Sequence, residues 1–393
     1  MAYKHKHSLL RFSSILLTSL ISLGVLMFPS VSAASIRIDE FPLPTSDSLP
    51  RVMAIGPDGN IWFTEQLSNK IGVMSQDGTL VNEYEIPTPG SAPTGIVLGP
   101  DGNMWFAEGY SNDLGSGGNK IGKVTPDGIF TEYDIPTPDS RPHIIITGPD
   151  NNLWFVEENG NNVTKVTTSG VFTSYAIPTP GAQPYGIVIG PDNDMYFTET
   201  GTNKIAKITT AGVITEFDEV PTDNSRPYEI ATGDDGNIWF TEQSGEKIGK
   251  MTPSGVYTEY PVPTPGALIS IKSAPDGNLW YTNQTGNKVG KITLAGDITE
   301  YTPPNELAYP GWLAITSDGT VWFSETFGNA IGRIQVLGAS TSNPTSDTTS
   351  NSSDGSLAKT GQNTKASVLI GVLLIATALA TGISRQKTTY RRR

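Results

Sequence analysis

Residues 56–65 have the sequence GPDGNIWFTE, and variants of this segment return six more times along the chain. The aromatic residue of the seven copies is Trp62, Trp105, Trp154, Tyr196, Trp239, Trp280 and Trp322. Successive copies are 43, 49, 42, 43, 41 and 42 residues apart, and the long interval contains a Gly/Ser/Asn-rich insertion at residues 109–118. Self-similarity at a period of about 40 residues is typical of repeat folds.

Each repeat predicts four short strands. An apolar run such as GIVL (residues 95–98) precedes the Pro-Asp-Gly turn and the Trp-containing segment, and NKIGKV (119–124) and TEYDIPTP (131–138) illustrate the two segments that follow. Asn-Gly and Asp-Gly turns between short alternating segments indicate antiparallel hairpins rather than helices. Four antiparallel strands per repeat of this length are typical of a β-propeller blade.

The two ends of the repeat array predict how the ring closes. The seventh repeat stops after NAIGRI (329–334) without a TEYDIPTP-like strand, whereas IRIDEFPLPT (36–45) is an orphan copy of that strand. We expect the N-terminal strand to complete the last blade, which leaves no blade edge uncovered. We therefore predict an all-β, seven-bladed propeller over residues 35–337.

Composition excludes several functions. Residues 1–33 contain three basic residues and residues 362–393 contain six, so the remaining 17 of 26 basic residues share the middle of the chain with all 39 acidic ones. An acidic body repels phosphate backbones, which argues against nucleic acid as a partner and favours cations and cationic ligands. The absence of cysteine excludes disulfides, zinc-thiolate sites and a cysteine nucleophile.

The segments outside the repeats predict export and a surface location. Residues 1–34 combine a basic start, an apolar run over 15–28 and small residues up to 34, which is the pattern of a signal peptide. Residues 338–356 are rich in Ser, Thr and Asn, contain almost no apolar side chains and predict a flexible linker.

The C-terminal end has three parts in a fixed order. The motif Leu357, Ala358, Lys359, Thr360, Gly361 precedes an uncharged segment at 366–384 and a basic tail at 385–393. Nineteen uncharged residues suffice to cross a membrane, and the basic tail favours the cytoplasmic side. This end resembles the sorting signal of Gram-positive-type bacteria.

The resemblance implies membrane anchoring, then cleavage after Thr360 by a sortase and attachment to the cell wall. A plain single-span anchor is the alternative.

Most repeated residues have a structural interpretation. Trp-Phe pairs such as Trp62/Phe63 provide large side chains that pack blade on blade. The Pro-Asp-Gly segments are interpreted as turns rather than calcium loops, because the other ligands of a calcium loop are missing.

Two rings of residues are expected at the upper end of the channel. The first contains the carboxylates that end the Trp-containing strands. These either pair with neighbours such as Lys70 and Lys120 or face the mouth, where repulsion favours raised pKa values or a bound Mg²⁺ or Ca²⁺. The candidate metal ligands are Glu157, Glu108 and Glu199.

The second ring, at the starts of the innermost strands, does not follow the repeat. Variation on a symmetric scaffold is where a selected ligand site is expected. Its aromatic and basic members suit stacking on sugar or peptide faces and hydrogen bonding to carboxylates. The candidate ligand-binding residues are Arg141, Tyr185, Tyr228, Arg226, Tyr309 and Trp312.

The repeat unit GPDGNxWFTE…NKIGKITPDG…TEYxIPTP resembles the virginiamycin B lyase (streptogramin lyase) family over all seven copies. The resemblance implies a magnesium-assisted elimination that opens a cyclic depsipeptide at its ester linkage. It further implies a Pro-His in one blade, a Glu-Pro-His in the next, and a Glu fourteen residues beyond the second His. In that pattern two Glu hold the metal, one His contacts the substrate and the other takes the proton.

Only His143 and Glu157 have that spacing here. Arg141 stands where the pattern has Glu, and Thr94 stands where the first His belongs. In the last two blades, where the family's site normally falls, the residues are Ile269 and Gly311. His143 is the single histidine outside the signal peptide, so a two-histidine mechanism does not operate here as in the family.

Two hypotheses of function follow, and whether the chain is an enzyme stays open. The first is a surface-anchored propeller that binds an extracellular carbohydrate, peptide or host-cell ligand through its top face. The second is a divalent-metal-dependent lyase or lactonase that opens a small cyclic ester with His143 as the catalytic base. We expect a monomer, because a closed propeller needs no partner to fold.

Overall fold

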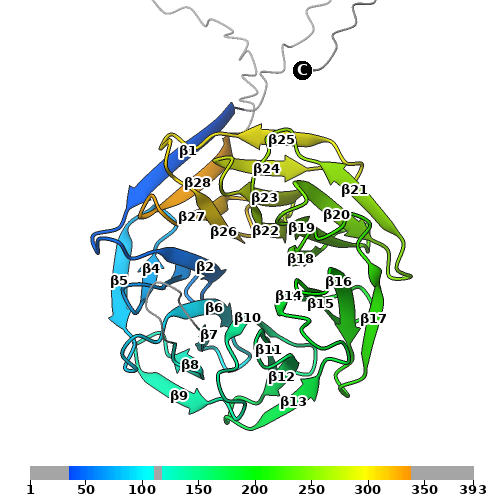
Figure 1. Cartoon of the computed structure of the whole chain (residues 1–393). Helices are drawn as coiled ribbons and strands as arrows, with labels where there is room; N and C mark the ends of the chain where they lie inside the picture. Colours follow the sequence, from blue (N-terminus) through cyan, green and yellow to red (C-terminus); the bar gives the residue numbers. More distant parts are fainter. Residues whose placement is uncertain (1–34, 110–116, 338–393) are drawn as a thin grey trace, which may run out of the picture. The chain divides into compact units, whose positions relative to one another are not determined.

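The computed structural model describes residues 35–109 and 117–337, which form seven four-stranded antiparallel sheets arranged radially around a central axis (Figure 1). The predicted signal peptide, linker, LAKTG motif, uncharged segment and basic tail lie outside these residues, as do residues 110–116 of the insertion. No helix in the described part of the chain is long and apolar enough to cross a membrane.

Six of the sheets contain four strands that are consecutive in the chain, ordered from the axis outward. Blade 1 contains β2 (Pro50–Ile55), β3 (Ile61–Glu65), β4 (Lys70–Met74) and β5 (Leu80–Glu85). Blade 2 contains β6 (Pro93–Leu98), β7 (Met104–Glu108), β8 (Lys120–Val124) and β9 (Phe130–Asp134). Blade 3 contains β10 (Pro142–Thr147), β11 (Leu153–Glu157), β12 (Asn162–Val166) and β13 (Phe172–Ala176). Blade 4 contains β14 (Pro184–Ile189), β15 (Met195–Glu199), β16 (Lys204–Ile208) and β17 (Ile214–Glu219). Blade 5 contains β18 (Pro227–Thr232), β19 (Ile238–Glu242), β20 (Lys247–Met251) and β21 (Tyr257–Pro261). Blade 6 contains β22 (Leu268–Ser273), β23 (Leu279–Asn283), β24 (Lys288–Ile292) and β25 (Ile298–Tyr301).

Blade 7 joins the two ends of the ring. It contains β26 (Pro310–Ile315), β27 (Val321–Glu325) and β28 (Ala330–Leu337), and its outermost strand is β1 (Ser35–Pro42). β1 pairs with β28 from Ser35↔Leu337 to Pro42↔Ala330, and Asp39 accepts a 2.6 Å hydrogen bond from Arg333. The predicted seven-bladed architecture and its closure by the N-terminal strand are both confirmed.

Aromatic side chains connect each blade to the next. All seven residues at the repeated Trp position are buried, and so are the Phe or Tyr residues that follow them. Trp105 of blade 2 shares a core cluster with Phe155 of blade 3, and Trp322 of blade 7 shares one with Phe63 of blade 1. The same pairing recurs around the ring, which confirms that these residues are structural.

Polar residues at repeated positions fix the turns. Asp58 accepts hydrogen bonds from the Asn60 amide and the Trp62 indole, and Gly59 has a φ of 77°, a left-handed conformation that suits glycine. This is a turn, as predicted. Asn329 donates to the carbonyls of Leu43 and Thr45 and accepts from Ser48. It therefore joins the start of β28 to the segment between β1 and β2.

Every innermost strand contains a register shift near its start. In blade 1 the shift lies between Pro50 and Met53, so Arg51 and Val52 together oppose Thr64. The other six innermost strands shift at the corresponding place. A bulge of this kind re-aims side chains at a strand end. It lies at the end of the channel where the second ring was predicted.

Candidate functional site

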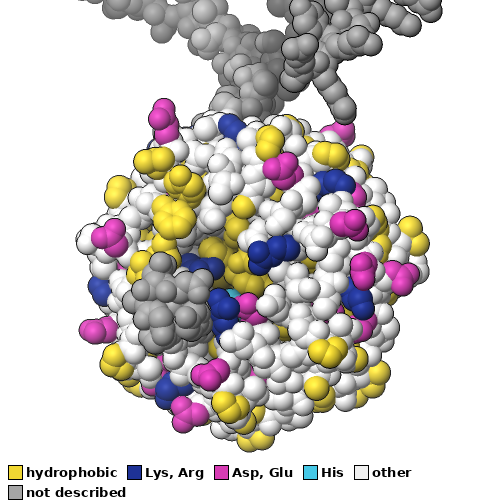
Figure 2. All heavy atoms as spheres, in the orientation of Figure 1, with side chains coloured by type: hydrophobic (Ala, Val, Ile, Leu, Met, Phe, Trp, Pro, Cys, Tyr) yellow, Lys and Arg dark blue, Asp and Glu magenta, His cyan; other side chains and the backbone are white. Residues whose placement is uncertain are grey.

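A pocket of about 300 Å³ opens at the channel end where the innermost strands begin (Figure 2). Its lining comes from the starts of the innermost strands, from the residues before them, and from the residues that follow the second strands. The lining residues are Leu49, Arg51, Gln66, Arg141, His143, Glu158, Gln183, Tyr185, Thr200, Arg226, Tyr228, Gln243, Ile269, Gln284, Trp312, Thr326 and Phe327.

Backbone strain accompanies several of these side chains. Leu49, Arg141, Gln183 and Arg226 each precede a proline and have φ between 47° and 56°, the left-handed region that favours glycine. Placing a residue other than glycine there costs roughly 1–2 kcal/mol. Ala92 and Tyr309 also precede a proline and have φ of 51° and 48°, although neither lines the pocket, so this strain belongs to the repeat and not to the pocket alone.

Three aromatic rings stack across the floor of the pocket. The rings of His143 and Tyr185 are 4.4 Å apart, and those of Tyr185 and Tyr228 are 3.7 Å apart and nearly parallel. Burial raises the pKa of both tyrosine hydroxyls, which therefore remain protonated at neutral pH. The floor is thus apolar and contains neutral hydrogen-bond donors.

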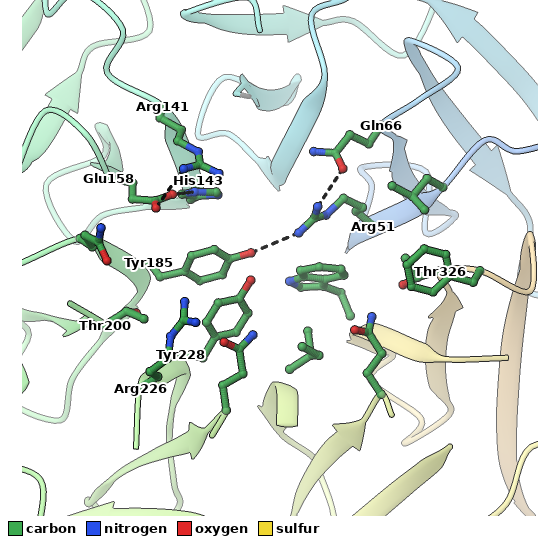
Figure 3. A pocket seen from close by; sticks show the side chains of 17 residues that line it. Arg51, Gln66, Arg141, His143, Glu158, Tyr185, Thr200, Arg226, Tyr228 and Thr326 are labelled. Carbon is green, nitrogen blue, oxygen red and sulfur yellow. Dashed lines mark hydrogen bonds and ion pairs between the residues drawn. The ribbon is translucent and has the colours of Figure 1, made fainter. Parts of the chain in front are cut away.

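Arg51 closes the opposite side of the floor. Its guanidinium lies 4.3 Å from the centre of the Trp312 ring, donates to Gln66 at 2.8 Å and contacts the Tyr185 hydroxyl at 3.3 Å (Figure 3). Its Nε is buried and has no hydrogen-bond partner in the described part of the chain. The innermost strands of blades 1, 4 and 7 therefore meet through one arginine.

His143 and Glu158 form a closely held pair. The Nε2 of His143 lies 2.5 Å from a Glu158 carboxylate oxygen, and the other oxygen accepts from Arg141 at 3.2 Å (Figure 3). Burial alone raises the pKa of Glu158, but the hydrogen bond and the charge of His143, followed by the charges of Arg141 and Arg226, outweigh it and lower that pKa. The carboxylate is therefore ionised at neutral pH.

Burial lowers the pKa of His143 below its ordinary value, although Glu158 opposes this effect. A neutral imidazole that donates its Nε2 proton to Glu158 keeps a lone pair on Nδ1. Nδ1 is buried and has no hydrogen-bond partner among residues 35–109 and 117–337. The pair thus resembles the carboxylate-oriented histidines that act as bases.

The predicted carboxylate ring lies elsewhere. Glu157, Glu108 and Glu199 are fully buried and none of them lines the pocket. Glu157 accepts hydrogen bonds from Thr164 and Asn162 of its own blade, and the next residue, Glu158, contacts His143 instead. Glu157 is the last residue of β11 and Glu158 begins the turn that follows, so these neighbouring carboxylates contact different partners.

Burial rather than mutual repulsion dominates the acidity of this ring. It raises the pKa of Glu65, Glu199 and Glu242 to about 7, that of Glu325 to about 8 and that of Glu108 to about 9. Lys70 and Lys120, considered as their partners, pair instead with Glu83 and Asp134 of the outermost strands.

The residues at the mouth do not fit a divalent cation. Mg²⁺ and Ca²⁺ require several oxygen ligands, usually including carboxylates. The described residues contain no group of three or more His, Asp or Glu side chains suited to a metal. Glu158, the one carboxylate of the lining among the described residues, already contacts His143 and Arg141, and three arginines line the same pocket. The pocket is therefore positively charged, whereas the propeller as a whole is acidic.

Most of the predicted ligand-binding ring does converge. Arg141, His143, Tyr185, Arg226, Tyr228 and Trp312 all line the pocket. Tyr309 does not, but its ring contacts Phe327, which does, at 5.3 Å.

Sequence reasoning missed the residues after the second strands, Gln66, Glu158, Thr200, Gln243, Gln284 and Thr326. The sequence contains a feature that distinguishes them: the residue at this position differs among the blades, whereas the preceding residue is Glu in six of the seven.

Comparisons with known proteins agree with this architecture. The virginiamycin B lyase family profile matches residues 31–196 and 187–358. A streptogramin B lyase structure shares 36% identity, with 77% of this chain and 98% of that chain covered and a TM-score of 0.71. Virginiamycin B lyase from Staphylococcus aureus shares 35% identity over 77% of this chain and 100% of its own, with a TM-score of 0.72. A catalytically inactive histidine-to-alanine variant of that enzyme, with quinupristin, has 35% identity, the same coverages and a TM-score of 0.71. Among curated proteins no match was found.

Proposed function

The chain belongs to the virginiamycin B lyase family, and we propose that it acts as a ligand-binding module through the pocket at the channel mouth. The observation that carries the proposal is that most of the positions that depart from the repeat, from six of the seven blades, converge on one pocket. Glutamines from four blades, Gln66, Gln183, Gln243 and Gln284, surround an aromatic floor. This combination of amides and rings suits a carbohydrate or a peptide.

The test is binding of the propeller, residues 35–337, to arrays of glycans, peptides and cyclic esters. The solved relatives are covered over 98% and 100% of their length by 77% of this chain, which supports the propeller as an independent folding unit. Binding is expected to disappear in Gln243→Ala plus Gln284→Ala. The control is Gln76→Ala, whose side chain contacts Gly59 at the opposite end of blade 1. Binding that survives the double variant would contradict the proposal.

A second candidate function is metal-independent opening of a cyclic ester. It is favoured by the His143–Glu158 contact, which leaves Nδ1 as an unprotonated base. In an elimination, the base removes a C–H proton, a C=C bond forms, and the C–O bond to the departing carboxylate breaks. Because Nδ1 is buried, this role ranks behind binding.

Mass spectrometry on a panel of lactones and cyclic depsipeptides tests the second candidate. Elimination leaves the mass of the substrate unchanged, whereas hydrolysis adds one water. The activity is expected in the wild type and absent in His143→Ala, and a wild type that is inert across the panel would end this hypothesis.

We also propose that the protein is exported and held at the surface of a Gram-positive-type cell. The support is the order of the signal peptide, linker, LAKTG motif, uncharged segment and basic tail. Digestion of the cell wall should release a fragment that ends at Thr360. Recovery of intact residues 361–393 on the mature protein would favour the single-span anchor.

A further inference from the structure

The arginines of the propeller are concentrated at the pocket. Residues 35–337 contain five arginines and eleven lysines. Arg37 and Arg333 hold Asp39 where the terminal strands meet, and the other three arginines line the pocket. None of these lysines lines it. The guanidinium group binds carboxylates through two parallel hydrogen bonds, whereas the ammonium of lysine acts as a point charge.

The pocket contains more positive charge than its own carboxylate neutralises. Glu158 faces His143 and Arg141, and no other Asp or Glu lines the pocket in the described residues. Arg226 is exposed, and its side chain has no hydrogen bond or ion pair within residues 35–109 and 117–337. Arg51 keeps a buried Nε without a hydrogen-bond partner there. The lining therefore has an excess of donors and of charge.

Further buried polar atoms of the lining also lack partners. The Nε1 of Trp312 and the Oγ1 of Thr326 have no hydrogen-bond partner in the described residues. Buried polar groups are normally satisfied, so such atoms in a pocket indicate a ligand with oxygen acceptors. The stacked Tyr185 and Tyr228 provide an apolar surface beside them.

We propose that this pocket binds, without a divalent cation, a ligand that carries a carboxylate next to a flat or apolar group. Arg226 and Arg51 contact the carboxylate, and Tyr228 contacts the flat group. The inference rests on the proposed binding function and names the chemistry of its ligand. Two sources share this chemistry, the C-terminus of a peptide and a uronic acid sugar.

The distribution of arginine permits a direct test by NMR. In the propeller labelled with ¹⁵N-arginine, each Nε–Hε signal is assigned by its loss in one Arg→Lys variant. Benzoate is titrated against benzamide, its neutral counterpart, in the presence of a chelator. The signals of Arg51 and Arg226 are expected to shift and saturate with benzoate only. Those of Arg37 and Arg333 are internal controls, because both contact Asp39 instead.

A matched pair of variants isolates the charge. Arg226→Gln is expected to weaken benzoate binding about tenfold, the usual size of one charge-assisted hydrogen bond. Gln183 occupies the corresponding place in blade 4 with a φ of 47°, so glutamine tolerates this backbone. The control is Lys288→Gln, which removes one positive charge from a half-buried lysine that donates to Thr302, outside the pocket.

Two further probe pairs identify the source. An acetylated tripeptide with a free carboxylate is compared with its C-terminal amide, and a galacturonate disaccharide is compared with its methyl ester. The pair with the larger difference in affinity names the source.

Several outcomes overturn the inference. Equal shifts with benzoate and benzamide, no response to any carboxylate at millimolar concentration, or tighter binding of inorganic phosphate would do so. Arginine signals that shift with benzoate only when Mg²⁺ is present would also overturn it. If array ligands bind in a pocket-dependent way but ignore Arg226→Gln, the binding function stands and the carboxylate inference falls. If no array ligand depends on the pocket, the binding function itself falls.

Discussion

In the blades the same side chain recurs at the same place, whereas at the channel mouth neighbouring blades contribute different ones. Each innermost strand begins with a proline, or with Leu268 in blade 6, and the residue after it differs from blade to blade: Arg51, Thr94, His143, Tyr185, Tyr228, Ile269 and Gly311. At the aromatic position, six blades have Trp and one has Tyr. The buried aromatic side chains hold the blades together around a closed ring. The residues at the channel mouth can therefore differ between blades without loss of the fold.

The comparison also separates two kinds of carboxylate. Glu242 ends the second strand of blade 5 and is buried within that blade, whereas Glu158 is one position further along blade 3 and faces the pocket. Blade 6 has Asn283 at the position of Glu242, where its amide donates to the Thr264 carbonyl. A neutral amide therefore fits the blade position, which indicates that the negative charge of the glutamates is not needed there.

The largest expected effect comes from the repeated aromatic residues. Trp154→Ala removes a fully buried indole that stacks on Tyr175 at 5.7 Å, and should lower the free energy of unfolding by about 3–5 kcal/mol. Urea unfolding followed by circular dichroism measures this loss. Arg226→Gln at the mouth is the comparison and should change the same free energy by less than about 0.5 kcal/mol. Equal losses would break the distinction between the two regions.

A smaller effect is expected at the closure of the ring. Asn329→Ala removes hydrogen bonds to Leu43, Thr45 and Ser48 and should cost about 1–3 kcal/mol. Because those bonds tie the N-terminal segment, hydrogen exchange of β1 should accelerate. The control is Asn161→Ala, which removes the corresponding bonds inside the ring. If hydrogen exchange of β1 also accelerates in Asn161→Ala, the Asn329 hydrogen bonds are not what holds β1 in place.

The repeats predicted the fold because each copy encodes a whole blade. The position of Trp62 and its six counterparts gave the blade number, and the orphan strand at 36–45 gave the closure. Turn chemistry at Asp58 and Gly59 needs only neighbouring residues, so it too was predictable.

The site was only partly predictable, because it depends on side-chain direction and on local charge. The position of His143 was visible in the sequence, but its partner is Glu158 rather than Glu157. The net charge of the chain favoured cationic ligands, yet the sum over 39 acidic residues hides three arginines in one pocket. Arg141 and Arg226 were predicted to lie in one ring at the mouth, and the structure places Arg51 in the same pocket.

A pH titration sharpens the comparison at the buried carboxylates. Their folded pKa values, about 7 to 9, lie above the ordinary value of 4.5. Their contribution to stability is therefore fully present below pH 4.5 and is lost as the pH rises through the folded values. The propeller should unfold at a higher urea concentration at pH 5 than at pH 8.

Glu242→Gln isolates one of these groups. The amide cannot ionise, so the variant should be more stable than the wild type at pH 8 and should show a flatter dependence between pH 5 and pH 8. Glu246→Gln, at an exposed glutamate of the same blade, should keep the wild-type slope. A variant with the wild-type slope at position 242 would remove burial as the cause.

The smallest expected effect concerns backbone strain at the mouth. Gln183 has a φ of 47°, which costs roughly 1–2 kcal/mol, whereas a glycine there loses about 0.5–1 kcal/mol more chain entropy on folding. Gln183→Gly should therefore stabilise the propeller by up to about 1 kcal/mol relative to Gln183→Ala, which retains the strain. Urea unfolding of the two variants measures the difference. Since both variants lack the amide that lines the pocket, both should bind array ligands more weakly than the wild type. A glycine variant no more stable than the alanine variant would mean that the mouth holds its side chains without strain.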